Sequence, residues 1–255
     1  MVDMAKLYKY LDAMGGLMML SNSNLQFTNA TRLNDPFDCH PSLMDFSNVP
    51  KSICKGWPPH VIQSLCSGRH ERYRERAWIC SLSKIFDSLL MWSYYSNHKG
   101  ICIGLDMEKV SNYLSQMHGQ IVIGCWVMEV QYRNIVEKPN YYRSVEDFFR
   151  YQMSTNAMAW KHEQEVRLIS WDPLPSYMRL LPHQDDREGP IDWKEIRAYL
   201  PIGGECFDSI YLGVTIDGKM KKRIVEEAKK LNPSIAIYQM KVDPDAFLLK
   251  PELIK

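Results

Sequence analysis

Short apolar runs separated by segments of helical spacing are the feature that most constrains the fold of this chain. The runs A-W-I-C-S-L at Ala77–Leu82 and G-I-C-I-G-L at Gly100–Leu105 have the composition of buried strands. Both are far shorter than the roughly 18 apolar residues that span a bilayer. Buried strands with helices segregated between them predict an α+β fold, with mixed, mainly antiparallel sheets flanked by helices.

The same signals place the remaining elements. Further strands are expected at residues 7–10 (also compatible with the start of a helix that runs to residue 20), 25–28, 121–132, 160–170, 178–181, 196–200, 209–212 and 235–240. Helices are expected at residues 59–75, 87–96, 107–118, 145–159 and 218–231. Residues 40–60 carry four prolines and little periodicity, which predicts an excursion over the surface.

The length and the net charge of the chain limit the classes of protein to which it can belong. The chain has 255 residues, enough for a sizeable core, and we expect one domain over residues 1–255. Within it, residues 6–170 carry the unusual motifs, and residues 171–255 supply closing strands and a strand-helix-strand unit. The formal net charge of +1 predicts no global field for nucleic acid or for an anionic membrane. No segment resembles a signal peptide, so a cytoplasmic location without a membrane partner is expected.

Several common sites have no motif in the sequence. The seven histidines stand singly, without the H-x-x-x-H spacing of a zinc site, and the seven cysteines form no C-x-x-C pair. We therefore expect reduced thiols and no bound metal. The chain also lacks a G-x-S-x-G elbow, a P-loop and a G-x-G-x-x-G turn, which excludes the commonest hydrolase, NTPase and dinucleotide-fold interpretations.

Two N-terminal segments carry polar side chains where the sequence pattern predicts a buried strand or a tight turn. In Y-K-Y, Tyr8 and Lys9 are either a core tyrosine beside a surface lysine or part of a site. In N-D-P-F-D, Asn34 and Asp35 precede Pro36, which predicts a tight turn with side-chain hydrogen bonds. The same two polar residues are candidates for ligand binding.

A third segment combines hydroxyls with aromatic rings. Ser81 and Ser83 alternate at the end of the strand expected at 77–82, and the helix expected at 87–96 contains M-W-S-Y-Y, with Trp92 and Tyr95. Such residues suit a flat polar ligand, although aromatic clusters also form cores.

The fourth segment is W-K-H-E-Q-E-V-R-L-I-S, from Trp160 to Ser170. If it is a strand, its period of two places Glu163, Glu165 and Arg167 on one face, with the two carboxylates roughly 7 Å apart. Two carboxylates at that distance perturb each other's pKa and can divide acid and base roles. In such a site Arg167 would keep the two glutamates in place and would be a candidate for ligand binding. The alternative is a solvated edge strand in which Arg167 pairs with one glutamate.

Taken in order, these motifs resemble a large family of bacterial and phage proteins known only as a domain of unknown function. The resemblance rests on L-Y-K-Y, L-N-D-P-F-D, C-S-L-S, L-M-W-S-Y-Y-S-N-H-K-G and W-x-x-E-x-E-V-R-L-I, and it covers residues 6–170. The family often carries a lysine four residues before the tryptophan, where this chain has Asn156. That departure bears on whether this chain is active.

The layout is also similar to the ADP-ribosyltransferase fold, which implies NAD as substrate and no metal. The resemblance implies Glu165 as the carboxylate that stabilises the oxocarbenium-like transition state and Glu163 as the residue that orients or deprotonates the acceptor. It further implies that Ser81 and Ser83 form the central Ser-x-Ser strand of the binding site, where Ser81 holds the ribose or Glu165. Lys9 or Tyr8 would steady a phosphate or the adenosine ribose, and Tyr95 or Trp92 would stack on nicotinamide. The acceptor would be a protein side chain, a nucleic-acid base or water. The role implied is that of a toxin or a phage-defence effector.

Two other functions remain open from the sequence. Asp35, Asp38, Glu163 and Glu165 would converge on a divalent cation in a metal-dependent nuclease. In a non-catalytic defence protein, the same pocket would sense a nucleotide or a phage component.

Overall fold

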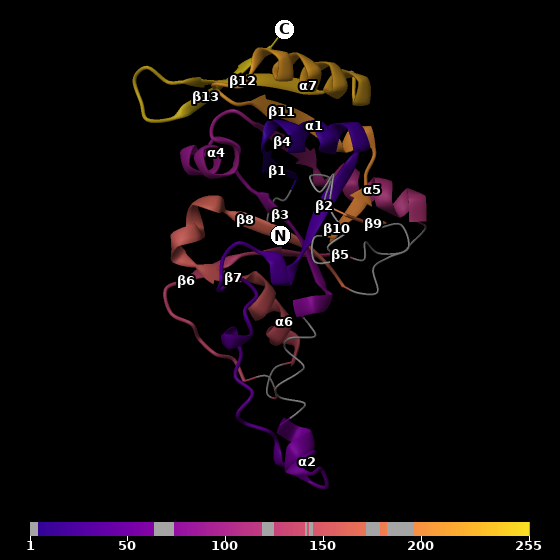
Figure 1. Ribbon diagram of the computed structural model, residues 1–255, viewed down its shortest axis with the longest axis vertical. Coiled ribbons are helices and arrows are strands. Elements are labelled where there is room, and N and C mark those ends of the chain that lie inside the picture. Colours follow the sequence, from indigo (N-terminus) through magenta and orange to yellow (C-terminus); the bar gives the residue numbers. More distant parts are fainter. Residues whose placement is uncertain are drawn as a thin grey trace.

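One branched sheet organises the chain, and its arrows cross the middle of Figure 1. The computed structural model describes residues 5–63, 74–118, 125–140, 142, 145–171, 179–182 and 196–254. The strands lie in the spatial order β13 (Leu249–Leu253), β12 (Ala236–Val242), β11 (Phe207–Leu212), β4 (Ile101–Asp106), β1 (Lys6–Leu11), β3 (Ala77–Ser83), β2 (Asn24–Asn29), β10 (Ile196–Pro201) and β9 (Arg179–Pro182). On its other edge β3 pairs with β8 (Glu165–Trp171), which in turn pairs with β5 (Cys125–Glu129).

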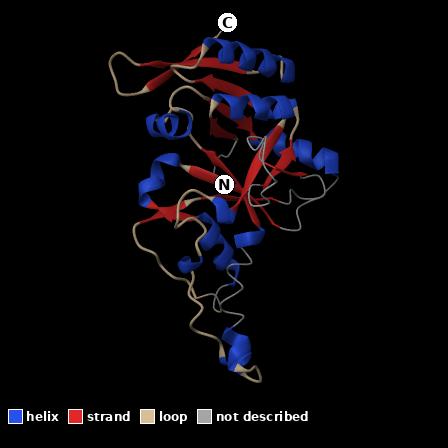
Figure 2. Cartoon of the chain, viewed as in Figure 1, coloured by secondary structure: helices blue, strands red, loops and turns tan. Residues whose placement is uncertain are grey.

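The sheet is antiparallel except where β11 pairs with β12. Two short strands, β6 (Gln131–Arg133) and β7 (Thr155–Ala157), form a separate parallel pair. The helices are α1 (Ala13–Asn22), α2 (Lys51–Cys54), α4 (Leu89–Ser96), α5 (Met107–His118), α6 (Val145–Ser154) and α7 (Gly218–Leu231). Figure 2 shows the helices other than α2 flanking the strands. The α+β class expected from the sequence is therefore confirmed.

Polar side chains cap the N-termini of three of the helices. Asp12 Oδ1 accepts a hydrogen bond from the Gly15 backbone N–H at 2.7 Å and so caps α1. Asp217 caps α7 in the same way, and Ser88 caps α4. These caps satisfy backbone donors that the first turn of a helix leaves free.

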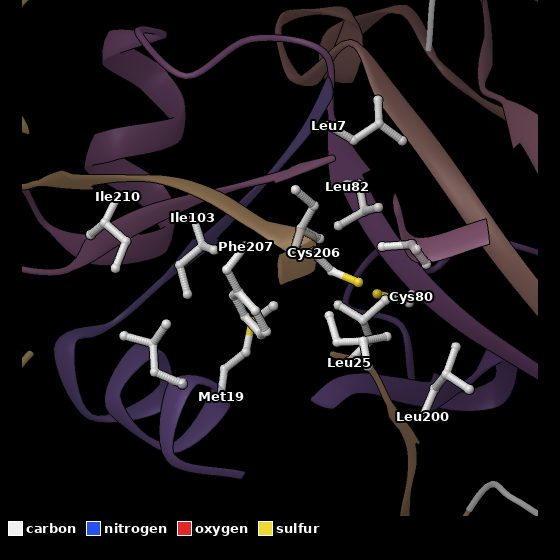
Figure 3. Packing of buried hydrophobic residues seen from close by; sticks show 14 of the residues in the cluster. Leu7, Met19, Leu25, Cys80, Leu82, Ile103, Leu200, Cys206, Phe207 and Ile210 are labelled. Carbon is white, nitrogen blue, oxygen red and sulfur yellow. The ribbon is translucent and has the colours of Figure 1, made fainter. Parts of the chain in front are cut away.

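The main core lies between the sheet and the helices α1, α5 and α7. Its members alternate along the strands with residues of the opposite face, as the period of two requires. Figure 3 shows Leu7 of β1 and Leu82 of β3 in this cluster, together with Phe207 of β11 and Met19 of α1. Burial of this apolar surface is the principal stabilising contribution to the fold.

The opposite face of the sheet carries two smaller apolar clusters. In the first, Trp92 and Met91 of α4 pack on Tyr10. In the second, Ile79 of β3 and Ile169 of β8 pack on Cys39 and further side chains. The part of this face that lies between the two clusters bears polar side chains, and the candidate site is there.

Several elements differ from the sequence-based expectations. The long strand expected at residues 121–132 is two strands, β5 and β6, and its first four residues lie outside the described residues. The helix expected at 145–159 ends at Ser154, after which the chain turns into β7. The edge strand β13 was not predicted. Most of the helix expected at 59–75, and residue 178, lie outside the described residues.

The segment that follows β2 leaves the sheet as expected. Residues 40–60 reach α2, which lies at the end of the molecule farthest from α7 in Figure 1. Within the described ranges, no helix has both the length and the apolar character that crossing a bilayer requires.

Candidate active site

A small pocket opens on the polar part of the sheet face. Its walls come from β1, β3, β8, α4, the loop at 33–38 and the segment at 156–163, and it is lined by Tyr8, Lys9, Tyr10, Leu33, Asn34, Asp35, Asp38, Ser81, Leu82, Ser83, Met91, Tyr95, Asn156, Trp160, Glu163 and Glu165. The cavity volume is about 90 Å³, room for a few waters, at about 30 Å³ of liquid volume per water, or for one ring-sized group. A larger ligand would therefore place only one end inside.

A split in the sheet forms the floor of the pocket. β1 and β2 share one edge of β3: β1 pairs with it at Ser83 and β2 at Trp78 and Ile79. Ser81 lies between these two pairings. Its carbonyl oxygen accepts a hydrogen bond from Lys9 Nζ at 2.7 Å. The backbone acceptor left free by the split thus holds the lysine of β1 beside the pocket.

The segment that carries the two glutamates is not one continuous strand. Residues Met158–Glu163 form a 3₁₀ helix, Gln164 adopts a left-handed conformation with φ 44°, and β8 begins only at Glu165. The expectation that Glu163, Glu165 and Arg167 share one strand face is therefore wrong for Glu163. Glu165 and Arg167 do share a face of β8, opposite Ser83 and Ser81 of β3.

Arg167 is fully buried and makes two charge-assisted contacts with carboxylates. Its Nε and Nη2 donate to the two oxygens of Glu165 at 2.9 and 2.8 Å. Its Nη1 and Nη2 donate to the two oxygens of Asp38 at 2.7 and 2.9 Å, and Nη1 also donates to the carbonyl of Met153 at 2.9 Å. All five N–H groups of the guanidinium are thereby used.

This network holds the guanidinium of Arg167 between the carboxylates of Glu165 and Asp38 beneath the pocket. Burial alone would lower the pKa of Arg167, but the Glu165 and Asp38 carboxylates hold it well above its ordinary value. Burial raises the pKa of Asp38, and the facing guanidinium opposes that effect. A cation fixed between two carboxylates leaves the group with one excess negative charge when both acids are ionised.

Glu163 has a different environment from Glu165. It is buried with 6% of its surface exposed, and one of its carboxyl oxygens accepts a hydrogen bond from Tyr95 Oη at 2.5 Å. Burial raises the pKa of Glu163 to about 7, against the lowering effect of the Tyr95 hydrogen bond. Burial and the adjacent Glu163 also raise the pKa of Tyr95 above its ordinary value. A carboxyl group with a pKa near 7 is suited to act as a general acid or base at neutral pH.

The N-D-P-F-D segment forms the tight turn that the sequence predicts. The backbone N–H of Phe37 donates to Asp35 Oδ1 at 2.9 Å, and that of Asp38 donates to the Asp35 carbonyl at 3.0 Å. The turn brings Asn34, Asp35 and Asp38 into the lining of the pocket. The segment whose hydrogen bonds form the turn thus also supplies three residues of the pocket.

Four predicted ligand contacts need correction or refinement. Arg167 is fully buried and is not among the residues that line the pocket, so it holds Glu165 and Asp38 and does not contact a ligand there. Trp92 is fully buried in the α4 cluster and its indole N–H donates to the Phe86 carbonyl at 2.8 Å, so the expectation that it contacts a ligand is wrong. Ser83 lines the pocket, but its hydroxyl donates to the Glu163 carbonyl at 2.6 Å and so positions that residue. Tyr8 lines the pocket while its ring packs on Phe86, with centroids 5.4 Å apart.

Several residues of the site were not among those predicted to bind NAD. Asn156 and Trp160 line the pocket, and Asp38 both lines it and holds Arg167. Tyr132 of β6 accepts a hydrogen bond from the Glu165 backbone N–H at 2.8 Å. Asp38 belongs to the N-D-P-F-D motif, so the sequence contained a signal for it. No motif surrounds Tyr132, so nothing in the sequence was a reason to place Tyr132 at the site.

The arrangement is poorly suited to a cation held by the acidic side chains. Arg167 occupies oxygens of both Asp38 and Glu165, which leaves few free ligands for a metal. Across the described residues, no group of three or more His, Cys, Asp or Glu side chains is placed to hold a metal ion. The cysteines at 39, 54, 80, 102 and 206 are free thiols.

Fold and site together define an α+β protein with a small pocket in which one carboxylate is fixed by an arginine and another titrates near pH 7. No family model, no curated protein and no solved structure matches the chain.

Proposed function

We propose that the chain binds NAD in this pocket and cleaves the bond between nicotinamide and ribose, as an ADP-ribosyltransferase or an NAD glycohydrolase. The observation that carries the proposal is the convergence of four distant segments on one pocket. β1, β3, α4 and β8 contribute Lys9, Ser81, Tyr95 and Glu165. Scattering of these residues over separate faces would have removed the reason to connect them.

Glu165 is the residue we assign to the transition state. When the bond from ribose C1 to nicotinamide nitrogen breaks, the electron pair leaves with the nitrogen and positive charge develops on the ribose. Glu165 lines the pocket and its orientation is fixed by Arg167. A preorganised carboxylate with net negative surroundings stabilises such a charge without first having to reorient.

Glu163 is the residue we assign to proton transfer. A water or hydroxyl acceptor that attacks ribose C1 must lose a proton, and a carboxylate with a pKa of about 7 takes it at neutral pH. The two glutamates thus divide the work because their environments differ, as in other two-carboxylate sites. Tyr95 holds Glu163 through its hydroxyl and offers its ring to the nicotinamide.

The other two interpretations receive less support. A nuclease needs free carboxylate oxygens for a cation, and Arg167 occupies those of Asp38 and Glu165. A sensor needs no titrating carboxyl in its pocket, yet Glu163 is buried there beside Tyr95. The transferase or glycohydrolase uses both features.

The direct test is to incubate the protein with NAD and to measure released nicotinamide by chromatography. We expect release by the wild type and a loss of at least about a hundredfold in Glu165→Gln, the scale for one electrostatic group in a transition state. Glu226→Gln is the matched control, because Glu226 lies exposed on α7. Far-UV circular dichroism verifies that each variant is folded.

Three outcomes would contradict the proposal. Absence of both nicotinamide release and calorimetric NAD binding would end it. Binding of NAD that survives Glu163→Gln and Glu165→Gln, without turnover, would favour the sensor. Magnesium-dependent nicking of DNA or RNA that is abolished by Asp35→Ala would favour the nuclease.

A further inference from the structure

Asp35 has a carboxylate oxygen without a hydrogen-bond partner. The side chain is 6% exposed, and its Oδ1 closes the turn by accepting the Phe37 N–H at 2.9 Å. Its Oδ2 is buried, and no group of the described chain donates to it. Asp35 is one of the residues that line the pocket, so the free oxygen belongs to a residue of the site.

A buried carboxylate oxygen without a donor is unfavourable by about 1–3 kcal/mol or more. The nearby cations do not satisfy this one. Lys9 donates to the Ser81 carbonyl, and all five N–H groups of Arg167 go to other acceptors. The described residues supply no donor to this oxygen, whereas an occupant of the pocket would be placed to supply one.

The lining also restricts the charge of the occupant. Among the described residues it contains the carboxyl groups of Asp35, Asp38, Glu163 and Glu165, whereas Lys9 is the one cationic side chain. An anionic group inside would be repelled, and a cationic or donor-bearing group would be attracted. With a cavity of about 90 Å³, the pocket has room for one ring and not for a pyrophosphate as well.

We propose that Asp35 is a specificity-determining residue that accepts a hydrogen bond from the carboxamide of a pyridinium ring, so that the pocket selects the amide over the corresponding acid. The inference rests on the proposed function, since the pyridinium ring is the nicotinamide end of NAD. That end is cationic and carries N–H donors, whereas the carboxylate of the deamidated ligand would face Asp35 Oδ2 with like charge.

Two small pyridinium compounds test the selection without requiring any reaction. N1-methylnicotinamide carries the carboxamide and N-methylnicotinate carries the carboxylate, and neither has a ribose to lose. We expect ligand-observed NMR titrations to show that the wild type prefers the amide by about tenfold or more. In Asp35→Asn we expect the preference to fall to about threefold or less, because the neutral side chain both accepts and donates.

Asp45→Asn is the matched control. Asp45 makes the same kind of turn, with its Oδ1 accepting the Ser47 N–H at 2.9 Å, but it lies outside the pocket lining. The control should keep the selectivity of the wild type. Equal binding of the two compounds by the wild type, or binding of neither, would overturn the role of Asp35, and these wild-type outcomes do not depend on the folding of any variant.

Failure of this inference and failure of the proposed function give different results. A protein that prefers N1-methylnicotinamide but releases no nicotinamide from NAD keeps the Asp35 site and loses the reaction. A protein that cleaves NAD but binds both compounds equally keeps the reaction and loses the Asp35 assignment.

Discussion

Replacement of Arg167 by methionine tests the charge network on which the site depends. Methionine fills much of the same volume but donates no hydrogen bond, so Asp38 and Glu165 would remain buried without the guanidinium between them. Removal of one partner from a buried ion pair destabilises a protein by about 3–5 kcal/mol. We expect a loss of that size in the free energy of unfolding near neutral pH, which for many proteins is a large part of the total.

The loss should depend on pH with a definite sign. Without Arg167 the two carboxyls are more stable protonated, so their folded-state pKa values lie above the unfolded values. Stability of the variant is then retained below the unfolded pKa of about 4 and lost as the pH rises through the folded pKa. The difference between wild type and Arg167→Met should therefore be smaller at about pH 5 than at about pH 7.5.

Urea unfolding followed by circular dichroism at these two pH values measures both quantities. Arg133→Met is the control, because Arg133 forms an exposed ion pair with Glu137 at 2.7 Å and should cost about 0–1 kcal/mol. The triple variant Asp38→Asn, Glu165→Gln and Arg167→Met should recover part of the loss, since it removes the unpaired charges. A loss below about 1 kcal/mol at both pH values, or an equal loss at both, would refute this account of the network.

Three further predictions follow from local geometry. The raised pKa of Glu163 means that wild-type stability falls as the pH rises from the unfolded pKa through about 7, by at most about 3–4 kcal/mol. Urea unfolding at a series of pH values should show this slope disappearing in Glu163→Gln. Gly100→Ala should cost about 2 kcal/mol or more, because its Cβ would collide with the Leu11 carbonyl, whereas Gly218→Ala has open space and should change the melting temperature little. Gln164→Val should destabilise by about 1–2 kcal/mol in urea unfolding, since a left-handed conformation disfavours β-branched residues, and Gln164→Gly should be tolerated.

The elements that the sequence predicted well are those whose signal is local. The helix at Met107–His118 and the helix at Gly218–Leu231 have the expected bounds, because their apolar spacing and caps lie within the segment itself. Buried strands such as β3 and β4 were found for the same reason. In contrast, β13 alternates little and exists because β12 offers it an edge, which is a tertiary effect.

Some of the residues that line the pocket could be predicted, because they belong to motifs that occur in a recognisable order along the chain. Tyr8, Lys9, Ser81 and Tyr95 line the pocket as expected. Trp92 does not, since it is buried in the cluster around Tyr10, whereas the Tyr95 hydroxyl reaches Glu163 in the site. A helix of unknown orientation gives no basis for choosing between its aromatic residues.

The sequence did not predict that Glu163 and Glu165 lie in different environments. Alternate spacing in E-Q-E predicts equal placement only if the strand is continuous, and here Gln164 breaks it. The break is supported by the end of β3, where the Ser83 hydroxyl donates to the Glu163 carbonyl and the Lys84 N–H donates to the Gln164 carbonyl. These partners lie about eighty residues away in the chain, so no window of local sequence contains them. Because of the break, Glu165 faces Arg167 while Glu163 faces Tyr95, and two identical side chains acquire different protonation behaviour.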